Sequence, residues 1–301
     1  MSLTKIRCVH IIIVSVLSVL FVTQSKPTFG RQQVEEFEHI FTQMSPDERI
    51  GQVFLVAFEG DVENFRIQEL IRDLKIGSLI VSEGNGKFSN SAAEEPASVQ
   101  VAHLTNSLQT FAWETNRKEI SNGEFYFLPL LLAVDHEGNG PPLTSLRSGM
   151  TNIPSQLSVG ATWRTQNAEI VGRIIGEELS AIGINMLLGP VVDVVDEPAQ
   201  TWKGNMGLRV FGGNPQWVGK FGRAYVNGVR KGSNGRIVTV AKHFPGHGDS
   251  DRTPDNEVAY LKHTLEELRN LDLIPFVMMT KKSEEDDFLS VDATMSVWRQ
   301  L

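Results

Sequence analysis

One segment of the chain, residues 241–251, carries most of the side chains that could bind or transform a polar ligand. It contains Lys242, His243, His247, Asp249 and Asp251. Ammonium, imidazole and carboxylate groups together donate and accept hydrogen bonds and transfer protons, as a site for a polar substrate requires. The pattern therefore predicts a binding or catalytic loop. The alternative is a polar loop whose histidines only satisfy backbone groups.

The residues around these side chains predict where the loop lies. Residues 236–241 form a short apolar run with β-branched residues, typical of a buried parallel strand. Pro245, Gly246 and Gly248 exclude a helix after it and favour a tight loop. Lys242 and His243 then lie at the carboxyl end of this strand. Active sites of barrels and open α/β sheets are built at that edge.

Strand and helix patterns alternate along the rest of the chain. The predicted strands are 53–58, 76–82, 127–134, 184–194 and 237–241, and 288–291 begins a sixth. The predicted helices are 62–74, 97–116, 166–182, 215–231 and 261–271. Near the start, 34–50 has helical spacing, and Ser45 and Pro46 are typical of a helix start at the cap and first position. Repeated strand–helix units of this length indicate a parallel sheet.

Composition restricts the function classes. The chain has 301 residues, of which 41% are hydrophobic and 21% charged, and this suits one globular domain of up to barrel size. The net charge is −8 with both signs interspersed, so the basic patch of a nucleic-acid-binding protein is missing from the sequence. The charged run 281–287 is interpreted as a solvated loop.

The first residues resemble a targeting segment. Lys5 and Arg7 precede an apolar run over 9–22, and small polar residues follow it, the pattern of a signal peptide. We expect cleavage after Ser25, so that residues 1–25 are the signal peptide and 26–301 the mature protein. The run is short for a membrane span, which needs about 20 residues; an uncleaved membrane anchor is the alternative. Because the only cysteine is Cys8, no disulfide is expected in the mature chain.

A series of short strings follows the predicted strand ends. In chain order they are Gly-Gln-Val-Phe (51–54), Leu-Ala-Val-Asp-His-Glu-Gly (132–138), Pro-Ser (154–155) with Gly-Ala-Thr (160–162), Gly-Ile-Asn (183–185) with Gly-Pro-Val-Val-Asp-Val (189–194), Arg-Val-Phe-Gly (209–212), Lys-His-Phe-Pro-Gly-His-Gly (242–248) and Leu-Ile-Pro-Phe (273–276). From about residue 45 to 277 the chain thus resembles glycoside hydrolase family 3, in particular its β-N-acetylglucosaminidase branch.

This resemblance implies a fold of the (β/α)8 TIM-barrel type. Since the sequence predicts only about six strands, we expect an incomplete barrel whose last strands are missing. Such a sheet has exposed edges, which are an aggregation liability. We therefore expect a chain that is poorly soluble alone or that needs a partner segment.

The resemblance also implies the roles of individual residues. Asp135 accepts hydrogen bonds from sugar hydroxyls, and Arg209, Lys242 and His243 donate to hydroxyls or to an N-acetyl group. His247 is grouped with these substrate-binding residues. Asp193 is expected to orient neighbouring loops rather than to touch substrate. The alternatives are a loop or helix-cap carboxylate for Asp135 and a surface ion pair for Arg209.

The chain departs from the family pattern at a substrate-binding arginine. Most relatives continue the Asp-His/Gln-Glu-Gly string with another Gly and an Arg that grips the sugar. This chain instead has Asn-Gly-Pro-Pro at 139–142, so this arginine contact to the distal part of the substrate is absent.

The chain also departs from the family pattern at the acid/base residue. The branch uses an Asp-Ser-His dyad a few residues after the Gly-His-Gly, where this chain has Thr253, Pro254 and Asp255. A buried carboxylic acid with a raised pKa can serve as the general acid. Asp255 is therefore the first catalytic candidate and Asp251 the second; the alternative for each is a solvated loop residue.

The family nucleophile is an Asp in a Ser-Asp-Asp-Leu-like string after a late strand. Only the string at 290–295 is similar, and it would make Asp292 the nucleophile. It lies too close to the Lys-His-Phe-Pro motif to be that element. The other hypothesis is that the nucleophile lies in sequence that this chain does not contain.

The function predicted from the sequence is an exported glycoside hydrolase. It would cleave β-linked N-acetylglucosamine or a related β-glycoside through a covalent glycosyl intermediate, with retention. No metal or other cofactor is expected. The predicted partner is the carbohydrate substrate, with no nucleic acid and no membrane beyond the alternative anchor. The rival hypotheses are a catalytically silent carbohydrate-binding or truncated family member, and a phosphorylase.

Overall fold

The computed structural model describes residues 38–59, 64–83, 88–91, 94–119, 125–138, 140, 144–195, 206–248, 259–260, 263–281, 290–296 and 299–300. The chain divides into two units, one up to Arg49 and one from Ile50 onward. The predicted signal peptide, Asp251 and Asp255 lie outside the described residues. In the described part no helix has the length and apolarity to cross a membrane.

Helix α3 (Pro46–Gly51) begins where the sequence predicts. The Ser45 amide donates to Glu48 Oε2 (2.8 Å), and the Glu48 amide donates to Ser45 Oγ (3.3 Å). This reciprocal pair satisfies two backbone donors that a helix start leaves without partners. The start of this helix was therefore predictable from local chemistry alone.

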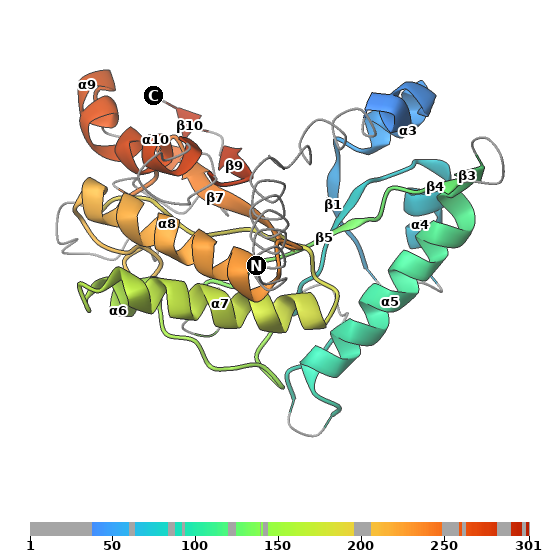
Figure 1. Ribbon diagram of the computed structural model, residues 1–301, viewed down its shortest axis with the longest axis horizontal. Coiled ribbons are helices and arrows are strands. Elements are labelled where there is room, and N and C mark those ends of the chain that lie inside the picture. Colours follow the sequence, from blue (N-terminus) through green and yellow to red (C-terminus); the bar gives the residue numbers. More distant parts are fainter. Residues whose placement is uncertain are drawn as a thin grey trace, which may run out of the picture. The chain divides into compact units, whose positions relative to one another are not determined.

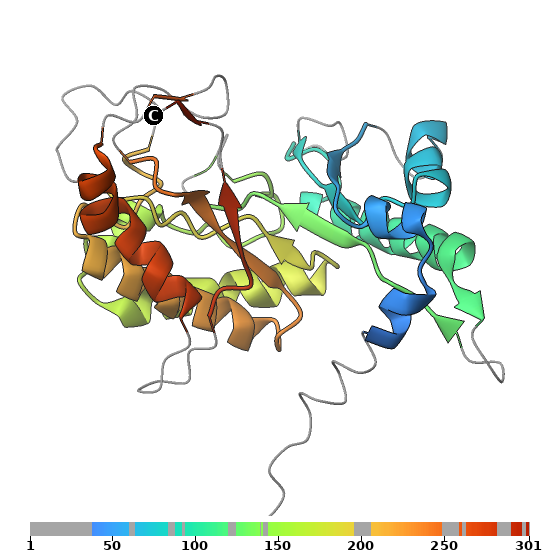
Figure 2. The same ribbon diagram turned by 90° about the horizontal axis from the view of Figure 1, so that it is seen from above.

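The second unit is organised around a six-stranded sheet with the strand order β1-β2-β5-β6-β7-β9. The strands are β1 (Leu55–Ala57), β2 (Ser78–Ile80), β5 (Leu131–Val134), β6 (Met186–Leu187), β7 (Val238–Phe244) and β9 (Ala293–Ser296). Every neighbouring pair is parallel, and the strands follow chain order across the sheet. Figures 1 and 2 show this curled sheet, with β9 beside β7. It is an incomplete barrel of the TIM type, as predicted.

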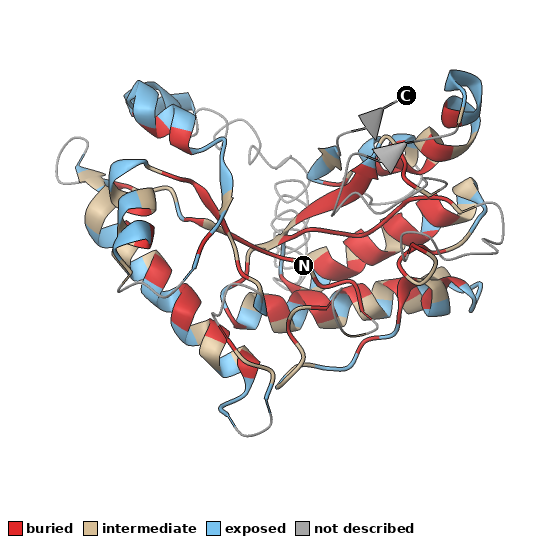
Figure 3. Ribbon diagram, turned by 180° about the vertical axis from the view of Figure 1, so that it is seen from behind, coloured by how far each residue is buried: buried red, intermediate tan, exposed pale blue. Residues whose placement is uncertain are grey.

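The helices cover one face of the sheet. The long ones are α5 (Ala97–Asn116), α7 (Thr165–Ala181) and α8 (Pro215–Gly232), which lie within a residue of their predicted ranges. Side chains of β5 alternate between two cores: Leu132 and Val134 join the main core with the helices, whereas Ala133 joins a smaller cluster with Leu188 and Val240. The alternation follows from the two-residue period of a strand. Figure 3 shows the buried stripe along α7 and α8.

Glycines allow α7 and α8 to approach closely. A Cβ atom at Gly172 would lie 2.2 Å from the Tyr225 carbonyl oxygen, and one at Gly228 would lie 2.1 Å from the Glu169 carbonyl oxygen. Since backbone atoms cannot move aside cheaply, these positions require glycine. The close helix pair supports β6 and β7, the strands that follow α7 and α8 in the chain.

The remaining elements are short. They are α4 (Phe65–Gln68), η1 (Glu69–Asp73), β3 (Lys118–Glu119), β4 (Phe125–Tyr126), α6 (Gln156–Gly160), β8 (Ala259–Tyr260), α9 (Leu265–Glu267), η3 (Leu268–Asp272), α10 (Leu273–Thr280) and β10 (Arg299–Gln300). The sequence did not predict the β3–β4 hairpin or α6. Two-residue strands and a five-residue helix are too short to produce a recognisable hydrophobic period.

The sixth strand begins later than predicted. The predicted start was at 288–291, but β9 covers Ala293–Ser296. Ser290 has a φ of 85°, in the left-handed region, which interrupts extended backbone before the strand can pair. Of the described strands, β1 and β9 form the sheet edges; the expected poor solubility stays a prediction.

Asp292 connects the segment before β9 to the first residues of β7 at the amino edge of the sheet. Its Oδ2 accepts hydrogen bonds from the Thr239 amide (2.8 Å) and hydroxyl (2.7 Å), and its Oδ1 lies 3.3 Å from Arg230 Nη2. Asp292 precedes β9 and Thr239 lies at the start of β7, so both are at the edge opposite to Asp135, which follows β5. Active sites of barrels lie at the carboxyl edge of the strands. Because Asp292 lies at the amino edge, the hypothesis that it is the catalytic nucleophile is wrong.

We predict that Asp292→Ala destabilises the fold. The buried Thr239 amide and hydroxyl would lose their acceptor, which costs about 1–3 kcal/mol of unfolding free energy. Denaturant unfolding followed by circular dichroism measures the change. The matched control is Asp73→Ala, which removes an exposed carboxylate paired with Arg72 and should leave the midpoint unchanged. An Asp292→Ala midpoint equal to that of the wild type would contradict the assigned role.

Candidate functional site

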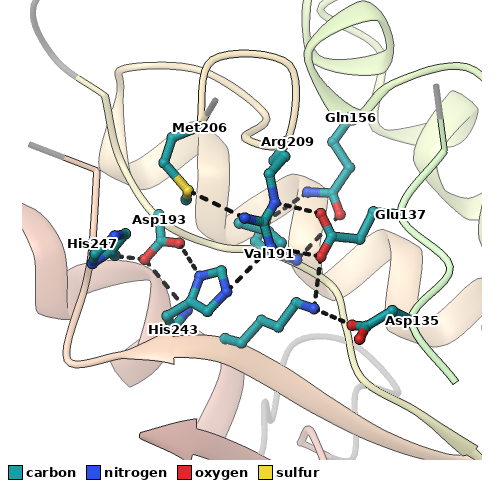
Figure 4. Close-up of polar contacts among 10 residues, drawn as sticks. Asp135, Glu137, Gln156, Val191, Asp193, Met206, Arg209, His243 and His247 are labelled. Atoms are coloured by element: carbon teal, nitrogen blue, oxygen red, sulfur yellow. Dashed lines mark hydrogen bonds and ion pairs between the residues drawn. The ribbon is translucent and has the colours of Figure 1, made fainter. Parts of the chain in front are cut away.

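Polar side chains from three strands and one loop meet at the carboxyl edge of the sheet (Figure 4). Asp135 and Glu137 follow β5, Asp193 follows β6, and Lys242 and His243 end β7. Arg209 comes from the loop before α8. We call these six residues the charged cluster. Carboxyl ends of parallel strands share one edge, so residues 107 positions apart, such as Asp135 and Lys242, come into contact.

Glu137 is the centre of the charged cluster. Its Oε1 lies 2.6 Å from Lys242 Nζ and 2.9 Å from Arg209 Nη2, and its Oε2 lies 2.7 Å from Arg209 Nε. The guanidinium thus binds the carboxylate through two parallel bonds, the strongest geometry for such a pair. All three side chains are almost completely buried. Arg209 is therefore part of a buried network, and the alternative of a surface ion pair is wrong.

The ion pairs determine the charge states. Burial alone would raise the pKa of the Glu137 carboxyl, but the positive charge of Lys242 and the hydrogen bond and charge of Arg209 outweigh it and lower the pKa to about 2. Burial would likewise lower the pKa of Lys242, but Glu137 and Asp135 raise it above its usual value. Glu137 is thus ionised and Lys242 is protonated at neutral pH.

Asp135 is the cluster carboxylate that solvent reaches. Its Oδ1 lies 2.5 Å from Lys242 Nζ, and 42% of the side chain is exposed, against 3% for Glu137. An ionised carboxylate can accept several hydrogen bonds, so Asp135 keeps acceptor capacity for a ligand while Lys242 holds it in place. This geometry suits the recognition of hydroxyl groups, and it is not that of a helix cap.

Asp193 holds the Lys-His-Phe-Pro-Gly-His-Gly segment through hydrogen bonds to both of its histidines. Its Oδ2 lies 2.7 Å from His243 Nδ1, and its Oδ1 accepts hydrogen bonds from the His247 amide (2.6 Å) and the His243 amide (3.3 Å). Asp193 is fully buried. It therefore orients the neighbouring loop, which is the role that the sequence predicted for it.

The contacts of His243 assign its tautomer. Its Nε2 lies 3.3 Å from Arg209 Nη2. A guanidinium only donates, so this nitrogen accepts, and the proton is on Nδ1, where it is donated to Asp193. His243 thus connects Asp193 to Arg209.

The loop geometry requires its glycine at 248. A Cβ atom there would lie 1.5 Å from the Val194 carbonyl oxygen, so only glycine allows this approach. The Val192 amide also donates to the Lys242 carbonyl (2.8 Å). The cis peptide bonds of this region are Gly189–Pro190, Lys242–His243 and Phe244–Pro245.

The predicted substrate-binding residues are thus brought together: Asp135 contacts Lys242, Arg209 contacts His243, and Glu137 joins Lys242 to Arg209. His247 is held through Asp193. Glu137 was missed as a site residue. The available signal was its spacing of two from Asp135, which places both side chains on one side of an extended chain. Within the described ranges, no group of three or more His, Cys, Asp or Glu side chains is arranged to hold a metal ion.

His136 stands between Asp135 and Glu137 in the chain, and its side chain is buried. It is 1% exposed, and neither ring nitrogen has a hydrogen-bond partner among the described residues; the same is true of the hydroxyl of Thr144, with which it pairs in an isolated antiparallel bridge. Asp135 and Glu137 point the other way because side chains alternate along extended backbone. Burial lowers the pKa of His136 to about 4, so the ring is neutral at physiological pH.

Comparisons with known proteins point to one family. The sequence profile described as "Glycosyl hydrolase family 3 N terminal domain" matches residues 45–287. The β-hexosaminidase A of Pseudoalteromonas piscicida is 31% identical over 220 residues, which are 72% of this chain and 33% of that protein. The β-hexosaminidase of Hydrogenovibrio crunogenus is 33% identical over 156 residues, or 50% of this chain and 41% of that protein.

Solved structures agree with these sequence relatives. A family 3 β-N-acetylglucosaminidase from Paenibacillus sp. superposes with a TM-score of 0.69 at 28% identity, covering 84% of this chain and 42% of the other. NagZ from Neisseria gonorrhoeae in complex with N-trifluoroacetyl-D-glucosamine has a TM-score of 0.59 at 26% identity, covering 81% and 63%. This chain therefore spans between a third and just under two thirds of the length of these four relatives.

We predict that acid destabilises the protein through His136. The folded-state pKa of about 4 lies below the unfolded value of 6.5. The stabilisation is thus complete above pH 6.5 and is lost as the pH falls toward 4, by up to about 3 kcal/mol. Unfolding free energies measured between pH 7 and 4 should fall less steeply in His136→Gln.

The matched control is His39→Gln, which changes an exposed imidazole and should keep the slope of the wild type. Glu137 does not interfere, because its lowered pKa affects stability only below pH 4.5. Equal slopes for His136→Gln and the wild type would show that His136 does not resist protonation.

Proposed function

We propose that this chain, which belongs to glycosyl hydrolase family 3, binds the terminal sugar of β-linked N-acetylglucosamine or of a related β-glycoside and hydrolyses the glycosidic bond. The observation that carries the proposal is the exposed carboxylate of Asp135 held by Lys242 at the edge of the charged cluster. The names of the relatives, β-hexosaminidase and β-N-acetylglucosaminidase, support the choice of sugar.

The charged cluster provides the two kinds of contact that a sugar hydroxyl requires. Asp135 accepts a hydrogen bond from one hydroxyl, while Lys242 and Arg209 offer donors nearby. Because Glu137 holds both donors in buried ion pairs, and Asp193 holds His243 beside Arg209, their positions are set before the sugar arrives. Preorganised donors lose little entropy on binding, which favours affinity and orientation.

Hydrolysis with retention needs a nucleophilic carboxylate and an acid/base about 5 Å apart. We assign the acid/base to Asp255, with Asp251 as the second candidate. Both lie outside the described residues, shortly after the loop that Asp193 fastens. The described cluster carboxylates Asp135, Glu137 and Asp193 are bound to Lys242, Arg209 or His243, which favours binding roles for them.

A second function is favoured by the placement of Asp292. Since this residue lies at the amino end of the sheet and binds Thr239, it is remote from the charged cluster. A carbohydrate-binding protein without turnover would have the same cluster and no nucleophile beside it. Hydrolysis and binding alone are therefore the two outcomes that an assay has to separate.

We predict that the protein releases p-nitrophenol from the β-N-acetylglucosaminide or the β-glucoside, and that calorimetry detects binding of the free sugar. Lys242→Ala should abolish both signals, because it removes a donor and leaves Glu137 and Asp135 less compensated. Asp255→Asn should stop turnover and retain binding, with Asp251→Asn tested beside it.

Asp292→Asn is the matched control, since it changes a carboxylate at the opposite edge of the sheet. The folded fraction of this variant should bind the free sugar and release p-nitrophenol like the wild type. Binding without turnover in the wild type would reject the hydrolase and support the binding protein. The absence of both would reject the proposed function, and acceleration of turnover by inorganic phosphate would indicate a phosphorylase.

We further propose that the protein is exported. The apolar run 9–22 behind Lys5 and Arg7 supports this location. Expression of the complete chain in a secreting bacterial host should give an extracytoplasmic protein whose sequence starts at Lys26. Recovery of the whole chain in the cytoplasm would contradict the proposal, whereas an uncut chain in the membrane fraction would support the anchored alternative.

A further inference from the structure

A tryptophan with two unfavourable features lies in the turn before α7. Trp163 is 64% exposed, although tryptophan is highly buried on average. Its φ is 53°, in the left-handed region that bulky side chains rarely adopt. The turn itself is closed by a hydrogen bond from the Trp163 amide to the Gly160 carbonyl (3.0 Å). A residue held in a costly conformation with its ring in solvent is a candidate for a binding role.

The exposed indole has rigid support. Its ring meets that of Trp217 edge to face, with centroids 5.4 Å apart and an angle of 88°. Trp217 in turn contacts Phe221 (6.1 Å), which stacks on Phe211 (5.6 Å). Lys220 Nζ lies 4.8 Å from the centroid of the Trp217 ring. This row of rings runs from the surface into the main core, so Trp163 rests on a fixed base.

The connections of the chain place Trp163 at the same sheet edge as the charged cluster. Helix α7 leads into β6 and helix α8 leads into β7, so the carboxyl ends of these helices lie near the amino edge of the sheet. Their amino ends, at Thr165 and Pro215, therefore lie toward the carboxyl edge. Trp163 and Trp217 occupy these two helix starts.

The support of Trp163 is joined to the loop that carries Arg209. The Leu157 amide donates to the Leu208 carbonyl (3.3 Å). A Cβ atom at Gly160 would lie 1.8 Å from the Phe211 carbonyl oxygen, so the helix before Trp163 and the loop after Arg209 touch directly. The exposed ring and the charged cluster thus belong to one continuous part of the structure.

We infer that Trp163, supported by Trp217, is a second carbohydrate-binding site, on which a sugar unit distant from the charged cluster stacks. The occupant is a β-linked N-acetylglucosamine oligosaccharide whose terminal unit lies at the charged cluster; this choice of sugar rests on the proposed function. An indole offers a large, rigid, apolar face at little entropic cost. The flat faces of pyranose rings carry C–H groups and match such a surface, while their hydroxyls stay in water.

The test compares ligands of different length by calorimetry, with Asp255→Asn as the parent protein so that the hexamer is bound and not hydrolysed. On this inference N-acetylglucosamine fills only the charged cluster, whereas its β-1,4-linked hexamer also contacts Trp163. We expect the parent to bind the hexamer more tightly than the monosaccharide. Trp163→Ala should weaken hexamer binding roughly three- to tenfold, as expected for one aromatic contact, and leave monosaccharide binding unchanged. Trp163→Asn, whose side chain tolerates the left-handed backbone, is the second variant in case the first does not fold.

Trp113→Ala is the matched control. Trp113 is also exposed, at 41%, but lies in the last turn of α5, near the amino edge of the sheet. Hexamer affinity should be unchanged in this variant. Equal affinities of the Asp255→Asn parent for the two ligands, or an undiminished hexamer affinity in a folded Trp163 variant, would overturn the inference.

The same measurements separate this inference from the proposed function. Two results together support the proposed function and the aromatic site. Lys242→Ala loses all sugar binding, and Trp163→Ala loses affinity for the hexamer but not for the monosaccharide. Hexamer binding that depends on Trp163 in a protein with no affinity for the monosaccharide would reject the cluster as a sugar site and keep the aromatic site. Monosaccharide binding without any length dependence would reject the aromatic site alone.

Discussion

The buried contact of Glu137 with Arg209 and Lys242 is the interaction on which the rest of the site depends. Removing such ions from water costs several kcal/mol each, and only close, well-aligned pairing offsets this cost. The bidentate geometry of Arg209 and the short contact to Lys242 provide that pairing. Because the three residues come from the end of β5, the loop before α8 and the end of β7, their pairing also holds these segments in one arrangement.

The charged cluster separates structural charges from ligand-binding ones. Glu137 and Asp193 are buried and saturated with intramolecular partners, whereas Asp135 shares Lys242 but remains open to solvent. Glu137 thus orients Arg209 and, together with Asp135, keeps Lys242 protonated. The His243 ring connects the two halves of the network.

Much of the scaffold was predictable because its signals are local. The ranges of α5, α7 and α8 follow from hydrophobic spacing, and the start of α3 follows from Ser45 and Glu48, which satisfy each other's backbone amides. The errors fall where no local period exists. The start of β9 depends on the backbone turn at Ser290, and α6 and the β3–β4 hairpin are too short to produce one.

The sequence by itself determined the parallel strand–helix order, the family resemblance and the residue types of the candidate site, because hydrophobic periods and turn residues act over short distances along the chain. Only the tertiary structure decided which charged side chains are buried in internal pairs and which remain open to solvent. It showed that Glu137 is the centre of the network, that Asp292 belongs to the opposite edge of the sheet, and that Trp163 is exposed. Burial and pairing depend on which strand ends meet, and residues more than a hundred positions apart carry no local signal of that meeting.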